Sequence, residues 1–201
     1  MKTGNRSHST TLLGLLTAIL LVMGMTPLGY LRVGLLSITL NMIPVAVGAA
    51  ALGPAGGAVL GAVFGTTSFL QCLGIGGISD MGLITFDISP FLTVIHRFFP
   101  RIVTGFLVGW IYQKMRKFTR AGIAGSVAGF SAALLNTVLF MGALLLLFGR
   151  EQAIVDMMKG RNWIQFIIAL VGVNAVVEMV VATVITGVLC AALERARVMR
   201  R

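Results

Sequence analysis

The residues best suited to chemistry are a few polar side chains placed within long apolar stretches. Glu178 follows Asn174 by four residues, a spacing that puts both side chains on one face of a helix. A carboxylate deep in a membrane costs about 2.5–3.5 kcal/mol on insertion scales, so Glu178 should face the protein interior and have a partner. That partner is either another helix or a ligand, and the sequence leaves both interpretations open.

Three asparagines offer the donors and acceptors that hydroxyls and amides require. Asn136, with its neighbour Thr137, lies past the middle of one apolar stretch. Asn174 is expected at a similar depth on the next stretch, and Asn41 lies at the start of an earlier one. These side chains either share one polar cavity or make independent packing bonds.

Two arginines, Arg97 and Arg101, lie four residues apart near one end of an apolar stretch. A guanidinium at that position suits a carboxylate or a phosphate. We expect Arg97 to reach out to lipid headgroups. Arg101 follows Pro100 and is expected to face inward, and Arg32 is a third candidate.

Signatures of the common enzyme classes are missing from the sequence, including HExxH, G-x-S-x-G and Walker A. The two cysteines, Cys72 and Cys190, lack metal-ligand spacing and are expected near opposite membrane faces, too far apart for a disulfide. We therefore expect no enzyme activity, no cofactor and no metal. If the chain moves a substrate, the energy must come from a partner.

The elements that position these residues are predicted to be membrane helices. The chain is 57% hydrophobic and 11% charged with a mean hydropathy of +0.98, whereas soluble domains carry about 25% charged residues. The apolar runs lack the alternation of barrel strands. We predict an all-α integral membrane protein, a single membrane domain over residues 1–201 with six helices. Their approximate ranges are 11–25, 42–52, 55–70, 98–113, 121–148 and 163–194.

The N-terminal helix has the basic flank of a signal peptide but no small-x-small cleavage site before Pro27, so we expect it to be retained. An ordered outer loop is expected before Asn41. The long glycine-rich connection over 71–99 is expected to serve as a lid, with a short interfacial helix near 90–95.

The chain is organised around residues 39–68, which contain two apolar segments joined at Gly53 and Pro54. Gly57, Gly61 and Gly65 fall on one helix face. This spacing favours close packing against another backbone, and the alternative is that the stripe shapes a polar cavity.

The net charge of +10 would suggest nucleic acid for a soluble protein. Here the cations cluster at loops and termini, which membrane topology and anionic headgroups explain better, so no nucleic acid partner is expected. Six spans put both termini on one side, and ten of the sixteen Lys and Arg residues fall there. This bias places both termini in the cytoplasm.

The order of several motifs resembles a known family. They are TPLG after the first helix, LNMIPVAVGAAALGPAGGAVLGAVFGTTSF, SPF before PRIVTGFLVGWIY, NTVLFMGALLL and NAVVEMVVATVI. Together they resemble the substrate-binding S component of an energy-coupling factor (ECF) vitamin transporter. The N-x-IPV, LGP-x-GG and NT motifs are most similar to the pantothenate type.

The resemblance implies a subunit of the plasma membrane that captures a vitamin at the outer face. It would deliver the vitamin together with a membrane scaffold subunit and two cytoplasmic ATPases. In the family, an alanine-x-x-x-alanine pair of the first helix docks on the scaffold, and Gly14 and Ala18 match that pair here. The family's substrate site maps onto the loop that ends at Asn41 and onto Arg101, Asn136, Thr137 and Asn174.

Three alternatives stay open. Another vitamin or precursor, such as riboflavin, a pyridoxine-like compound, or a pyrimidine or queuosine precursor, would keep the mechanism. A small intramembrane enzyme would need a convergent pair, for example Glu178 with His96. A structural membrane subunit would need no ligand.

Overall fold

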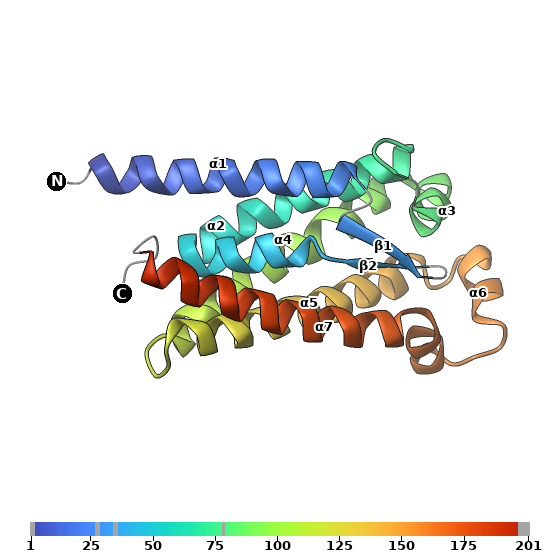
Figure 1. Ribbon diagram of the computed structural model, residues 1–201. Helices are drawn as coiled ribbons and strands as arrows, with labels where there is room; N and C mark the ends of the chain where they lie inside the picture. Colours follow the sequence, from blue (N-terminus) through green and yellow to red (C-terminus); the bar gives the residue numbers. More distant parts are fainter. Residues whose placement is uncertain (1–2, 27–28, 34–35, 78, 197–201) are drawn as a thin grey trace.

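The computed structural model describes residues 3–26, 29–33, 36–77 and 79–196, without the side chains of residues 3–7 and 30–38. The side chain of Arg32 therefore lies outside the described part. The described chain is a bundle of long helices that run along one axis (Figure 1). Five are long and apolar enough to cross a membrane: α1 (Thr3–Met25), α2 (Met42–Leu70), α4 (Pro90–Met115), α5 (Ala121–Phe148) and α7 (Trp163–Arg195).

Shorter elements gather at one end of the bundle, where Figure 1 shows the β hairpin, α3 and α6. They are β1 (Tyr30–Val33), β2 (Leu36–Thr39), η2 (Gln71–Leu73), α3 (Asp80–Ile88) and α6 (Gln152–Met158). We call this the hairpin end. The opposite end, called the terminal end, holds the start of α1, the connection between α4 and α5, and the end of α7 (Figure 1).

The α2 element folds back on itself at Gly53, whose φ of 79° and ψ of −172° are not helical. A Cβ on Gly48 would lie 2.0 Å from Cδ1 of Leu60, although residues twelve apart on a straight helix are about 18 Å apart. Glycine tolerates the positive φ, and Pro54 suits the first turn of the second arm. Figure 1 shows the two arms running in opposite directions, and they correspond to the predicted segments 42–52 and 55–70.

The outer loop expected before Asn41 contains an antiparallel hairpin in which Tyr30 pairs with Thr39. Two strands of four residues are too short to give an alternating pattern above the apolar background. The α4 helix begins at Pro90, eight residues before the expected start. Ser89 caps it, accepting the N–H of Leu92, and the helix continues through Pro100.

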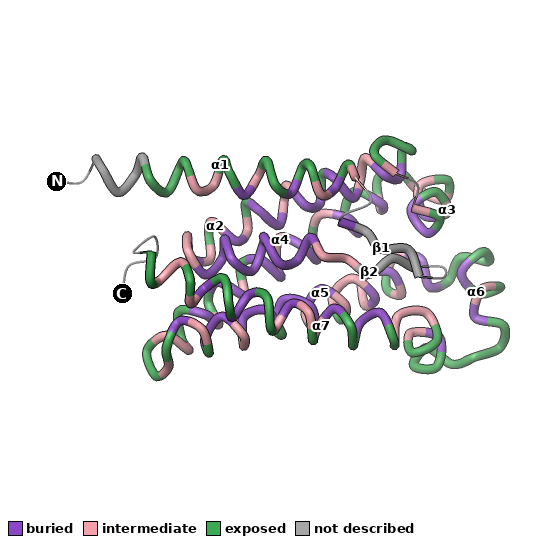
Figure 2. Tube along the Cα trace, viewed as in Figure 1, coloured by how far each residue is buried: buried purple, intermediate pink, exposed green. Residues whose placement is uncertain are grey.

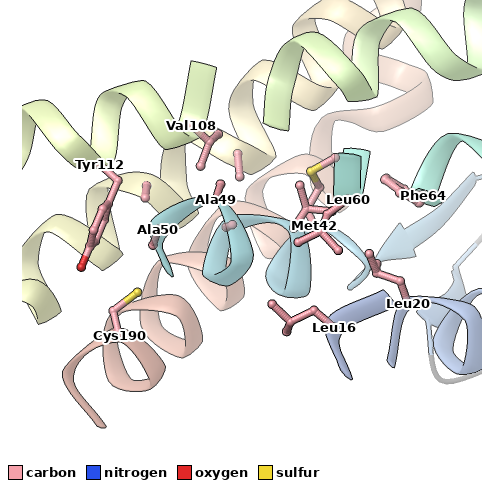
Figure 3. Close-up of a cluster of buried hydrophobic side chains, with 14 of the residues drawn as sticks. Leu16, Leu20, Met42, Ala49, Ala50, Leu60, Phe64, Val108, Tyr112 and Cys190 are labelled. Carbon is pink, nitrogen blue, oxygen red and sulfur yellow. The ribbon is translucent and has the colours of Figure 1, made fainter. Parts of the chain in front are cut away.

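The main apolar core lies where α1, α2, α4, α5 and α7 meet. Figure 3 shows it, with Leu16 and Leu20 of α1 beside α2, and Tyr112 of α4 near Cys190 of α7. Burial is concentrated in the helices drawn below α1 in Figure 2, and only 17% of the apolar window of α1 itself is buried. The first helix is thus attached to the bundle along one side only.

The glycine stripe of the second α2 arm packs directly against the backbone of α4. A Cβ on Gly57 would lie 2.1 Å from the carbonyl oxygen of Gly105, and one on Gly61 would lie 2.2 Å from that of Arg101. A Cβ on Gly65 would lie 3.2 Å from the carbonyl oxygen of Arg97. The close-packing interpretation of this stripe is correct, and the contact also brings two arginines against α2.

Candidate binding site near the hairpin end

Two buried arginines of α4 converge on one hydroxyl of α2. Arg97 and Arg101 are each 4% exposed. Arg101 donates to the Ser68 hydroxyl oxygen at 3.0 Å and to the Arg97 carbonyl at 2.8 Å, and Arg97 donates to the same hydroxyl at 3.4 Å. The expectation that Arg97 reaches lipid headgroups is therefore wrong. Because α4 approaches α2 so closely at Gly65, the Arg97 side chain is enclosed between helices.

Aromatic rings flank the arginine pair. The Arg101 guanidinium carbon lies 4.6 Å from the ring centre of Phe64 and 4.7 Å from that of Phe140. Arg97 lies 5.3 Å from the Phe140 ring centre. Such cation–π contacts, each worth about 0.5–2 kcal/mol, hold a guanidinium in place without neutralising its charge.

His96 completes the surroundings of Phe140. Its ring is fully buried, 4.2 Å from the Phe140 ring centre and 5.9 Å from that of Phe148. Its Nε2 lies 3.2 Å from the Phe140 carbonyl oxygen. The described partners of His96 thus lie on α5, whereas the described partner of Glu178 is the hairpin, so the two side chains share no hydrogen-bond partner among the described residues.

Several buried polar atoms have no hydrogen-bond partner among the described residues. They include both amide atoms of Asn41, the hydroxyl of Thr104 and the amide oxygen of Asn136. Buried polar groups are nearly always paired, and leaving one unsatisfied costs about 1–3 kcal/mol. These atoms come from the N-cap of α2, from α4 and from α5, and each is available to a bound polar molecule or to water.

On α7, Asn174 and Glu178 are both buried. A carboxylate oxygen of Glu178 accepts the backbone N–H of Thr39, the last residue of β2. The sequence left open another helix or a ligand as the partner of Glu178, and the partner that the structure describes is neither of these but the backbone of the hairpin. Thr137 is half-buried beside Asn136.

Gly14 and Ala18 lie on the exposed side of α1. A Cβ on Gly14 would meet nothing within 4 Å. The small-residue pair therefore does not pack against the described part of the bundle, which leaves this face of α1 open to a partner or to lipid.

Five residues of this candidate site were not in the predicted set, namely Ser68, Phe64, Phe140, Thr104 and Arg97. Phe64 lies four residues before Ser68, Phe140 four residues after Asn136, and Thr104 three residues after Arg101. Helical spacing from Asn136 and Arg101, which were already chosen, would have found Phe140 and Thr104. Phe64 could be found only from Ser68, which was not chosen. Arg97 was considered, but nothing local in the sequence marks it as buried.

The arrangement is suited to binding an anion. Because both guanidiniums donate to the Ser68 hydroxyl, the two donating nitrogens lie within roughly 6 Å of each other. Two positive charges at that separation repel each other by about 3 kcal/mol at an effective dielectric constant near 20. An anion between them would relieve this repulsion. Among the residues that the structure describes, no three His, Cys, Asp or Glu side chains gather as a metal site would require.

Two comparisons with known proteins place the chain in a family. A family model described as "ECF transporter, substrate-specific component" matches residues 8–190, which include every candidate site residue. One relative is "Pantothenic acid transporter PanT" of Lactococcus lactis subsp. cremoris (strain MG1363). It is 30% identical over 172 residues, which cover 79% of this chain and 79% of the relative.

Proposed function

This chain belongs to the family of ECF transporter substrate-specific components, and we propose that it captures pantothenate for import across the plasma membrane. The family and the apolar helices make it a multi-pass membrane protein. The arginine pair at Ser68 is the observation that carries the proposal for the substrate. Pantothenate has one carboxylate for that pair.

The rest of the vitamin fits the remaining polar atoms. Pantothenate carries one amide and two hydroxyls besides its carboxylate. The amide of Asn41, the hydroxyl of Thr104 and the amide oxygen of Asn136 are buried and lack partners among the described residues. They offer both donors and acceptors, which matches an amide and two hydroxyls. The name of the relative, a pantothenic acid transporter, points to the same ligand.

The proposed orientation puts the hairpin end outside and both termini in the cytoplasm. Counting the two arms of α2 as separate passes gives six. The terminal end then carries the basic connection between α4 and α5, with Lys114, Arg116, Lys117 and Arg120, as the positive-inside rule requires. The arginine pair lies toward the other end, so the vitamin would enter from outside.

The chain is proposed to act as a single membrane domain and as a binding subunit, not as an enzyme. An ECF scaffold subunit and two ATPases would supply the energy. The exposed face of α1, with Gly14 and Ala18, would dock on the scaffold because small side chains let two helix backbones approach closely.

Reconstituted uptake tests this function. Proteoliposomes should contain the chain with an ECF scaffold and its two ATPases, ATP inside and radiolabelled pantothenate outside. We expect the label to accumulate only when both ATP and this chain are present. Accumulation of riboflavin without pantothenate would contradict the assignment of the vitamin, and no accumulation of any vitamin by an assembled complex would contradict the role itself.

A further inference from the structure

The base of the β hairpin is held between the first and the last long helices. On one side, the Leu40 N–H donates to the Gly29 carbonyl at 3.1 Å. Gly29 in turn lies against α1, because a Cβ there would be 2.3 Å from the carbonyl oxygen of Met23. On the other side, the Thr39 N–H donates to the Glu178 carboxylate of α7. Figure 1 shows the hairpin lying between α1 and α7 at this end of the bundle.

Asn41 follows this base directly and is fully buried. It is the N-cap residue of α2, yet its side chain makes no capping hydrogen bond. Asparagine is among the preferred N-cap residues, and a side-chain cap is typically worth about 1 kcal/mol. The Asn41 backbone has helical angles, φ −63° and ψ −18°, instead of the extended conformation from which an N-cap side chain usually bonds, so the amide does not serve as a cap. Both amide atoms also lack a partner among the described residues.

The direction of the Asn41 amide depends on how the preceding backbone is held. A Cβ on Gly29 would lie 2.8 Å from the Asn41 amide oxygen, so the side chain already touches the hairpin base. Thr39 is two residues earlier, and its N–H is fixed by Glu178. A shift of the Thr39 backbone would therefore move Asn41 with it.

We infer that Glu178 is a positioning residue for the vitamin, acting through Thr39 and Asn41 and not by touching the ligand. Its carboxylate holds the base of the hairpin against α7, and this hold aims the Asn41 amide into the binding site. The inference rests on the proposed function for the identity of the ligand. The mechanical part, the hold on the hairpin, stands without any ligand.

The two roles predict different effects of removing the charge alone. Gln at position 178 keeps an acceptor oxygen and nearly the same volume, so it can still accept the Thr39 N–H. Ala at this position removes the acceptor. A positioning residue should therefore tolerate Glu178→Gln much better than Glu178→Ala, whereas a residue that uses its charge on the ligand should tolerate neither.

The first measurement is hydrogen–deuterium exchange of the purified protein without ligand, followed over peptides that contain residues 39–41. We expect Glu178→Ala to speed exchange there at least about tenfold, because a bond to a charged acceptor is stronger than an average hydrogen bond. Glu178→Gln should exchange close to the unaltered rate. Thr183→Ala is the matched control on α7, because among the described residues that hydroxyl bonds within its own helix, to the Met179 carbonyl.

The second measurement is a double-mutant cycle on pantothenate affinity. Glu178→Ala and Asn41→Ala should each weaken binding roughly tenfold, and the double variant should be no weaker than Asn41→Ala alone. Glu178→Gln should bind within about threefold of the unaltered chain, because it retains the acceptor.

Additive effects of Glu178→Ala and Asn41→Ala on affinity would overturn the inference. So would a Glu178→Gln variant that binds pantothenate as poorly as Glu178→Ala while its exchange over residues 39–41 is unchanged. That second result would make Glu178 a direct ligand contact. Absence of pantothenate binding by the unaltered chain would contradict the proposed function instead. The exchange of residues 39–41 in Glu178→Ala would still decide whether Glu178 holds the hairpin.

Discussion

At the scale of single residues, the arginine pair depends on the geometry of a guanidinium. Arg101 uses separate nitrogens for the Arg97 carbonyl and the Ser68 hydroxyl, and its guanidinium carbon lies over the rings of Phe64 and Phe140. Lysine has a single ammonium group and no planar face, so it cannot make this set of contacts together.

We predict that Arg101→Lys weakens pantothenate binding roughly tenfold to hundredfold, although the charge is kept. One or more charged hydrogen bonds, worth about 1.5–3 kcal/mol each, would be lost or displaced. Isothermal titration of the purified protein measures the change. Arg116→Lys is the matched control, because Arg116 pairs with Glu194 at the terminal end. Equal affinity of Arg101→Lys and the unaltered chain would show that this arginine is not part of the site.

Residue types indicated part of this candidate site from the sequence, and helix packing determined which other side chains lie beside the arginine pair. Arg101, Asn136 and Asn41 stood out because polar groups in apolar stretches require a reason to be there. Arg97 was misjudged because a long cationic side chain near a helix end can equally reach lipid headgroups. Its burial depends on the neighbouring α2 arm, where Gly65 lets the two helices approach, and this pairing is not visible in either segment alone.

At the scale of elements, the glycine stripe sets the distance between α2 and α4. Gly61 lies against the backbone of Arg101 itself, so the stripe fixes the height at which this arginine meets Ser68. A carbonyl oxygen cannot move out of the way as the end of a side chain can. Any added side chain must therefore push the helices apart.

We predict that Gly61→Ala destabilises the protein by about 1–3 kcal/mol, as overpacking does, and weakens binding as well. Gly142→Ala on α5 is the control, because a Cβ there meets nothing within 4 Å. It should leave the melting temperature unchanged or slightly higher, since alanine favours helix over glycine. Thermal unfolding in detergent compares the two variants, and equal melting temperatures would contradict the packing argument.

The exposed side of α1 is the second element with a specific expectation. We predict that Gly14→Trp and Ala18→Trp abolish uptake in the reconstituted transporter while pantothenate binding stays within about twofold, since neither residue faces the bundle. Leu16→Trp, on the buried face of the same helix, is the contrasting variant and should lower stability. Loss of binding in Gly14→Trp would indicate a fold defect instead of a docking surface.

Some elements were predictable from the sequence, and others were too short or too close to a neighbouring element to be recognised. The turn at Gly53 was expected because glycine and proline interrupt an apolar run, and the structure shows a positive φ there. The β hairpin gave no signal, because four-residue strands are too short for their alternation to stand out. The α4 helix starts early because Ser89 caps it and Pro90 occupies its first turn. From the sequence, the segment near 90–95 was interpreted as a separate short helix.

At the scale of the whole molecule, the proposed orientation has a direct consequence for labelling from the two sides of the membrane. The connection between α4 and α5 contains Phe118, which is 82% exposed. The loop after α6 contains Lys159, which is also exposed, at the hairpin end. The two positions lie at opposite ends of the bundle.

We predict that, in a variant without the native cysteines, Phe118→Cys reacts with a membrane-impermeant maleimide only in inside-out vesicles. Lys159→Cys should react only in right-side-out vesicles. Opposite labelling would invert the topology and place the arginine pair toward the cytoplasm. Both native cysteines, Cys72 and Cys190, are buried, so replacing them by Ser or Ala removes background without touching an exposed surface.

The measurement that tests the central claim most directly is equilibrium binding by the purified chain alone, without scaffold or ATPases. Pantothenate and panthenol, its neutral alcohol analogue, differ only at the group that would meet the arginine pair. We predict one-to-one binding of pantothenate at micromolar strength or tighter, panthenol binding at least about tenfold weaker, and loss of this preference in Arg101→Ala. Equal affinity for the two compounds, or no binding of either by a folded sample, would contradict the account.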